Sequence, residues 1–185
     1  MGVKAPDFQR LLTRARQAMW TRWLPPEGAI RLLDIGCGTA EEAGEFLASG
    51  RVVDFLGVDL DEGAIAQARA RWPEARWICA DAARLSSKTL GGRFDAILIR
   101  RPDLLLQPAR WRRVFRRLSE WLRPGGWIIV TVIGDGEAEL ARRWLEETGL
   151  RVFQVERLPW PEERVLLLAG HAGCPEGLSG EEGDG

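Results

Sequence analysis

Residue types that often carry protein chemistry are scarce in this chain. It has three widely spaced cysteines, Cys37, Cys79 and Cys174, and one histidine, His171. Neither a disulfide framework nor the paired ligand spacing of a zinc site is present, so a reducing cytoplasm is the simplest compartment. His171 and Cys174 are spaced as one pair of metal ligands, but no second pair accompanies them. We therefore expect a cytoplasmic protein without a metal.

Long hydrophobic runs and an excess of charge are also missing. No apolar stretch approaches the roughly 20 residues that cross a bilayer, and the first 20 residues lack the apolar core of a signal peptide. The formal net charge is -1, which argues against a nucleic-acid or membrane surface spread over the whole molecule. We expect no membrane partner, while a local basic face remains possible.

The composition suits one soluble globular domain, with 185 residues of which 45% are hydrophobic. Apolar residues recur at helical spacing over 7–24, and Pro25 and Pro26 end this predicted helix. Residues 171–185 are rich in glycine and acidic residues, which predicts a disordered tail. The expected organisation is therefore an N-terminal helix within 1–27 that caps the site, a domain over 28–170, and the tail.

The central region alternates between strand-like and helix-like segments. The strand-like runs are almost continuously apolar, as expected when helices cover both faces of a parallel sheet. Two further strands follow the last helix with only a short connection, which favours an antiparallel hairpin at the sheet edge. The prediction is an α/β fold with one doubly wound, mostly parallel seven-stranded sheet. The expected strands are 30–35, 54–60, 75–80, 94–100, 127–133, 151–158 and 164–170, and the expected helices are 40–49, 62–72, 108–123 and 136–148, with a weaker crossover over 82–93.

The first strand ends in the sequence LLDIGCGTAEEA, where ligands bind in folds of this kind. Gly36 and Gly38 would let the backbone approach a ligand closely, and Thr39 is a candidate cap for the next helix. A dinucleotide fingerprint needs a third glycine where this chain has Glu41. That glutamate, Glu42 and a carboxylate expected at the same mouth from Asp34 would repel a diphosphate. A cofactor with cationic groups is favoured, and a nicotinamide dehydrogenase is disfavoured.

Two more acids end the next two strands. Asp59, in GVDLD, is placed to accept hydrogen bonds from ribose hydroxyls. Asp81, in CADA, could receive the exocyclic amine of a base. Aspartate is common after strands because it caps turns, but three such acids with the GCG turn favour a binding site.

These segments, together with FDAILIR and LRPGGWIIVT, resemble the successive motifs of class I S-adenosylmethionine-dependent methyltransferases over about residues 28–134. The resemblance implies the cofactor S-adenosylmethionine and a Rossmann-like fold. It places the methionine end of the cofactor at the first motif and adenosine at the next two, and it places the end of the fourth strand at the transferable methyl. The implied cofactor-binding residues are Asp34, Gly36, Cys37, Gly38, Asp59, Leu60, Asp81, Ala82 and Arg100.

The end of the fourth strand, RRPD, lacks the Asn-Pro-Pro-aromatic turn of family members that methylate amines of bases or glutamine. Arg100 or Arg101 could hold an anionic substrate, and Asp103 could act as a base, although surface pairing or turn capping explains each equally well. No catalytic residue is assigned. Trp20 and Trp23 are candidates for an acceptor pocket in the predicted N-terminal helix.

Arginines crowd the helix predicted over 108–123. Arg110, Arg113 and Arg117 share a face, which allows an RNA-binding patch, but a solvated helix face is the favoured interpretation. The leading hypothesis is a methyltransferase acting on an unidentified acceptor, with a small molecule expected. The alternative is a non-catalytic protein of the same fold that binds the cofactor and serves as a partner or scaffold.

Overall fold

The computed structural model describes residues 20–173. Most of the helix expected over 7–24, and most of the expected tail, lie outside these residues. The described end of that segment, Trp20–Trp23, is a short 3-10 helix, η1, in which both tryptophans are buried. His171 is not part of a tail, because it pairs with Leu150 as the last residue of a strand.

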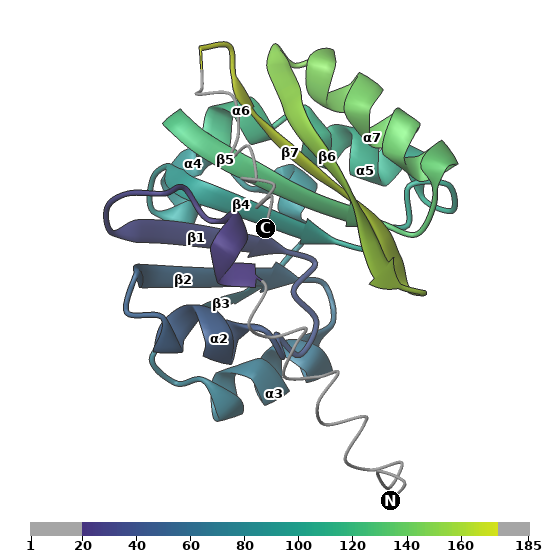
Figure 1. Cartoon of the computed structure of the whole chain (residues 1–185). Coiled ribbons are helices and arrows are strands. Elements are labelled where there is room, and N and C mark those ends of the chain that lie inside the picture. The colour runs from purple at the N-terminus through teal and green to yellow at the C-terminus, as the bar shows by residue number, and fades with distance from the viewer. Residues whose placement is uncertain (1–19, 174–185) are drawn as a thin grey trace, which may run out of the picture.

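Seven strands form one sheet in the order β3-β2-β1-β4-β5-β7-β6 (Figure 1). The first five are parallel, while β7 is antiparallel to both β5 and β6. The predicted α/β fold with an antiparallel edge hairpin is therefore confirmed. The strands are β1 (Ile30–Ile35), β2 (Val52–Asp59), β3 (Arg76–Cys79), β4 (Phe94–Arg100), β5 (Leu122–Val132), β6 (Leu150–Trp160) and β7 (Glu163–His171).

Helices cover both faces of the sheet (Figure 1). Neighbouring residues of β1 show the alternation, since Leu33 packs with one core and Leu32 with the other. The first core includes α4 (Ser87–Leu90), α5 (Pro108–Phe115), α6 (Leu118–Trp121) and α7 (Asp135–Glu146), and the second includes η1, α2 (Ala43–Ala48) and α3 (Glu62–Arg71). Each fully buried leucine or isoleucine of these strands contributes roughly 1.5–3 kcal/mol.

The helix expected over 108–123 is two helices, α5 and α6, and β5 already begins at Leu122. Val114, Phe115, Leu118 and Trp121 are all buried in the same core. The break at Arg116–Arg117 therefore leaves the apolar stripe intact, which is why periodicity did not reveal it. The weak crossover over 82–93 contains a short 3-10 helix, η2 (Ala82–Arg84), followed by α4.

No helix among residues 20–173 is long and apolar enough to pass through a membrane.

Candidate functional site

The glycine turn after β1 is held against the end of β2. The backbone amides of Gly36 and Cys37 both donate to the carbonyl of Val58, at 2.8 and 3.2 Å. Gly36 and Gly38 have φ angles of +73° and +53°, a region that glycine adopts without steric cost. These two positions therefore explain the G-x-G spacing by backbone geometry.

Asp59 joins this turn to the second strand. Its Oδ2 accepts a hydrogen bond from the amide of Gly38 at 2.8 Å, and its Oδ1 accepts one from the amide of Asp61 at 2.9 Å. Each carboxylate oxygen has more than one lone pair, so a ligand hydroxyl can still bind. The carboxylate thus supports the turn and also faces the space beyond the sheet.

The chain after the turn differs from the expectation that Thr39 caps a helix. Ala40 adopts a φ angle of +49°, and α2 begins only at Ala43, with Glu42 in the N-cap position without a side-chain cap. Because Ala40 is left-handed, α2 begins about one turn later in the sequence than expected. Glu42 therefore folds inward instead of lying on the first helical turn.

Asp34 is buried, whereas the sequence predicts a carboxylate exposed at the mouth of the site. It is 1% exposed, and neither of its carboxylate oxygens has a hydrogen-bond partner among residues 20–173. Burial and the nearby Glu42 raise the pKa of Asp34 well above its usual value, although Arg100 opposes this. Burial of a carboxyl group disfavours its charged form, so Asp34 repels an anionic ligand less than an exposed carboxylate would.

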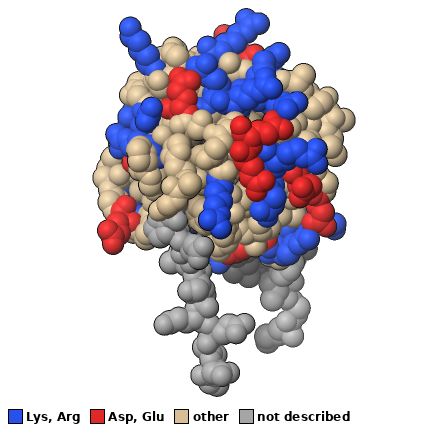
Figure 2. Space-filling view, turned by 90° about the horizontal axis from the view of Figure 1, so that it is seen from above, with Lys and Arg blue, Asp and Glu red and all other residues tan. Residues whose placement is uncertain are grey.

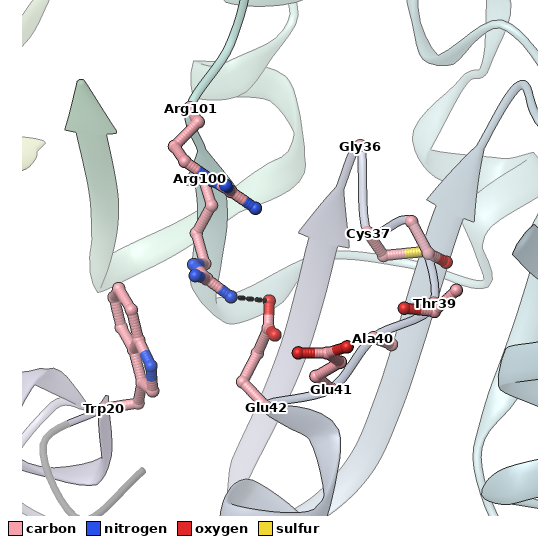
Figure 3. A pocket seen from close by; sticks show the side chains of 10 residues that line it. Trp20, Gly36, Cys37, Thr39, Ala40, Glu41, Glu42, Arg100 and Arg101 are labelled. Atoms are coloured by element: carbon pink, nitrogen blue, oxygen red, sulfur yellow. Dashed lines mark hydrogen bonds and ion pairs between the residues drawn. The ribbon is translucent and has the colours of Figure 1, made fainter. Parts of the chain in front are cut away.

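A buried ion cluster lies beside Asp34. Arg100, at the end of β4, pairs with Glu42 from the turn at 2.5 Å (Figure 3). It also pairs with Glu163 from the edge hairpin at 2.5 Å. Its guanidinium also lies over the ring of Trp20, 4.6 Å from the ring centroid. Burial alone would lower the pKa of Arg100, but the two glutamates raise it above the ordinary value. Arg100 therefore links three segments that are distant in sequence.

Two cavities meet at the glycine turn. The first, of about 380 Å³, is lined by Trp20, the turn from Gly36 to Glu42, Arg100 and Arg101. The second, of about 250 Å³, lies beyond the ends of β2 and β3 and includes Asp59, Leu60, Ala82 and Trp111. Both cavities share Gly36, Arg100 and Arg101. An elongated ligand can therefore cross the turn from one cavity into the other.

Known proteins similar to this chain include methyltransferases. Residues 32–126 match the methyltransferase domain family. A Geobacillus sp. (strain WCH70) protein named "Putative methyltransferase GWCH70_2453" is 37% identical over 138 residues, which cover 68% of this chain and 54% of that protein. The chain belongs to the methyltransferase family. It spans about half the length of this curated relative.

Solved structures agree on the fold. The N-methyltransferase NodS from Bradyrhizobium japonicum WM9 matches with a TM-score of 0.69 and 20% identity, covering 85% of this chain and 94% of NodS. The cyclase SpnF matches with a TM-score of 0.69 and 18% identity, covering 85% of this chain and 80% of SpnF. At this identity the matches show the fold alone. The predicted class I S-adenosylmethionine-dependent methyltransferase family is nevertheless confirmed by the family match.

The predicted cofactor residues of this chain separate by the cavity that they line. Cys37 and Gly38 line the first cavity, Asp59, Leu60 and Ala82 line the second, and Gly36 and Arg100 line both. Asp34 and Asp81 line neither of the two. The side chain of Asp81 instead accepts a hydrogen bond from the amide of Ala83 at 3.1 Å. Cys37 is buried, and burial together with Asp34 raises the pKa of its thiol, so it remains protonated.

Sequence reasoning missed the two glutamates that bind Arg100. Glu42 was treated as an exposed charge at the turn, and nothing in the hairpin sequence PEERV signals that Glu163 is fully buried. Trp20 is a sequence-based candidate for the acceptor pocket, and it lines the first cavity. Only the fold brings β4, the turn and the hairpin together.

The arginines after β4 are mostly occupied in structural contacts. Arg112 pairs with Glu147 at 2.9 Å, Arg117 pairs with Glu120 at 3.1 Å, and Arg110 lies 3.9 Å from Asp81. Acidic side chains also lie among the basic ones on the face in Figure 2. These observations favour a solvated helix face over an RNA-binding patch. Among the described residues no group of three potential metal ligands occurs, and Cys174 lies outside them.

Proposed function

We propose that this chain is an S-adenosylmethionine-dependent methyltransferase acting on a small molecule. The observation that carries the proposal is the contact between Asp59 and the amide of Gly38, which joins the glycine turn to the nucleoside side of the site. Family membership supports the same cofactor, and NodS has been solved in complex with S-adenosyl-L-homocysteine.

The residues present fit this cofactor. The two cavities accommodate an amino-acid part beside Gly36 and Gly38 and an adenosine beside Asp59 and Leu60. Asp59 would hold the ribose hydroxyls, because a carboxylate at the end of the second strand accepts two hydrogen bonds. The Asp34 carboxyl group, which has no hydrogen-bond partner among residues 20–173, and backbone carbonyls of the turn are the candidates to accept from the ammonium group.

When bound, the cofactor supplies a methyl group on a positively charged sulfur. The chain then has little chemistry to perform beyond aligning the acceptor and excluding water. Trp20, Arg100 and Arg101 form the wall where this occurs (Figure 3). Asp103 is exposed and accepts a hydrogen bond from Gln107 at 3.3 Å, so it is available to take a proton from an acceptor that carries one.

Calorimetric titration with S-adenosylmethionine, S-adenosylhomocysteine and NAD tests the cofactor assignment. We expect the first two to bind and NAD not to bind. Asp59→Ala should weaken S-adenosylhomocysteine by roughly 100-fold, because it removes charge-assisted hydrogen bonds and the support of the turn. Glu62→Gln is the matched control, since it removes an exposed acid three residues away. Equal affinities of the Asp59 variant and the parent would contradict the ribose assignment.

The alternative is a cofactor-binding scaffold without activity. SpnF, which is described as a cyclase, shares this fold, so the fold alone does not establish methyl transfer. Transfer of a labelled methyl group into a small-molecule extract separates the two. Label that requires the protein and is lost in Asp59→Ala supports the enzyme, whereas cofactor binding without transfer supports the scaffold.

A further inference from the structure

Arg101 occupies the junction of the two cavities. The cavities share only Gly36, Arg100 and Arg101 among their lining residues. A ligand that occupies both must pass these three residues, and two of them are cations. The chemistry available at this junction therefore depends on how much of each positive charge is already neutralised.

Arg100 is fully engaged by the protein. Its Nε and Nη2 bind Glu163, its Nη1 binds Glu42, and the ring of Trp20 covers its face. Its side chain is 13% exposed. Two carboxylates thus balance one guanidinium, and little of this charge is left for a ligand.

Arg101 stands in contrast. Its side chain is 50% exposed, and among residues 20–173 its single ion pair joins Nε to Glu163 at 3.3 Å. That contact leaves both Nη groups free to bind. Figure 3 shows the guanidinium extending from the end of β4 into the space between Arg100 and the glycine turn.

The backbone fixes this direction. Arg101 has a φ angle of +47°, an unfavourable conformation for a residue with a long side chain, and its amide donates to the carbonyl of Thr131 at 2.9 Å. Half of the Arg101 side chain is exposed, so packing in the core does not account for its conformation. Strained residues persist where the surrounding structure holds them, and they are often found at binding sites.

The charges around the junction define which ligand suits it. Glu41 lies on the opposite wall of the first cavity, and Asp59, Asp61, Asp103 and Arg110 line the second. A cofactor with a positively charged sulfur would bring a further cation beside Arg101. An anionic group on the other substrate would be attracted by both charges.

Resting on the proposed function, we propose that Arg101 binds a carboxylate of the methyl acceptor and thereby selects carboxylate-bearing small molecules. The two free Nη groups form a planar fork that matches a carboxylate. Arg100 supports this role by holding Glu42 and part of the charge of Glu163 away from the bound anion. The amino-acid part of the cofactor also carries a carboxylate, so the experiment must separate these two sources.

The test uses the full chain saturated with S-adenosylhomocysteine and two matched pairs of probes. The pairs are 4-hydroxybenzoate with 4-hydroxybenzamide, and N-acetylglycinate with N-acetylglycinamide. We expect the parent protein to bind at least one carboxylate about tenfold more tightly than its amide in saturation-transfer NMR titrations. Arg101→Gln should reduce this preference to less than about twofold, and Arg101→Lys should keep part of it.

Arg113→Gln is the matched control, because it removes an exposed arginine of α5 that lines neither cavity. It should leave the preference unchanged. The proposal is overturned if the parent binds neither carboxylate at about 10 mM, if carboxylate and amide bind equally, or if Arg101→Gln retains the preference.

A second binding experiment tests whether Arg101 binds the carboxylate of the cofactor instead of that of the acceptor. S-adenosylhomocysteine carries the amino-acid part, with its carboxylate and its ammonium group, and 5′-methylthioadenosine lacks it. We expect Arg101→Gln to change the affinity for both by less than about threefold. A selective tenfold loss for S-adenosylhomocysteine would assign Arg101 to the cofactor and overturn the acceptor proposal. Failure of the parent to bind S-adenosylhomocysteine at all would instead contradict the proposed function.

Discussion

Arg100 and Arg101 are neighbours in sequence but have opposite surroundings. The side chain of Arg100 is 13% exposed and lies between Glu42 and Glu163, whereas Arg101 is half exposed with one longer contact to Glu163. The difference follows from the end of β4, where the last residue of the strand directs its side chain towards Glu42 and Glu163, while the next residue adopts a left-handed conformation at the mouth. Arg100 therefore joins segments of the fold, whereas Arg101 faces the cavities.

The largest expected effect comes from removing the buried cation. Arg100→Met leaves Glu42 and Glu163 without their shared partner, and breaking a buried pair in this way costs about 3–5 kcal/mol. Arg101→Gln should change the free energy of unfolding by less than about 1 kcal/mol, because that side chain is half exposed. Urea unfolding of both variants measures the contrast. Equal losses would mean that the two arginines share one structural role.

A triple variant refines this result. Replacing Arg100 by Met together with Glu42→Gln and Glu163→Gln removes the charges as a set. It should lose less stability than Arg100→Met alone, because no buried charge is left unpaired. A larger loss than in the single variant would show that hydrogen bonds, and not charge balance, stabilise the cluster.

Glu163→Gln should have a smaller effect, about 2–3 kcal/mol, because Arg100 still has Glu42 as a partner. The exposed pair between Arg157 and Asp135, at 2.6 Å with side chains 70% and 74% exposed, gives a control. Asp135→Asn should cost less than about 0.5 kcal/mol. A cost for Glu163→Gln as small as that of the control would contradict its role as a buried link.

The raised pKa of Asp34 predicts a pH effect of known sign. Its folded-state pKa is raised above the unfolded value, so its contribution to stability is complete below the unfolded pKa and is lost as the pH rises through the folded pKa. Asp34→Asn removes this titration. The variant should gain stability over the parent at pH 7, and the gain should shrink towards pH 4. Unfolding curves across this range test it, and a difference that does not change with pH would refute it.

Much of the fold was predictable because it depends on local signals. Apolar strand runs, the short link before the last strand, and the glycine turn were each visible in sequence and define the sheet and its binding edge. The break between α5 and α6 was not visible, because it preserves the apolar stripe formed by residues such as Val114 and Leu118. The predicted cofactor residues themselves remain a prediction.

Side-chain directions at the site were less predictable for a physical reason. Asp34 and Glu42 were both expected to face a ligand, yet one is buried and the other is bound by Arg100. The position of Glu42 follows the left-handed conformation of Ala40, and Glu42 shares Arg100 with Glu163, which lies 121 positions later (163 minus 42). A contact over such a separation leaves no local pattern. The electrostatic argument from exposed acids therefore applies mainly to Glu41.

The smallest expected effect concerns Ala40 itself. Its φ angle of +49° is unfavourable for alanine and suits glycine. Ala40→Gly should therefore raise the free energy of unfolding by at most about 1 kcal/mol, since relief of strain is partly offset by the greater freedom of glycine in the unfolded chain. Ala43→Gly, within α2, is the control and should lower it by about 1 kcal/mol. Two losses of equal size would show that Ala40 is not strained and that another contact, such as the hydrogen bond from Trp72 to its carbonyl, sets the turn.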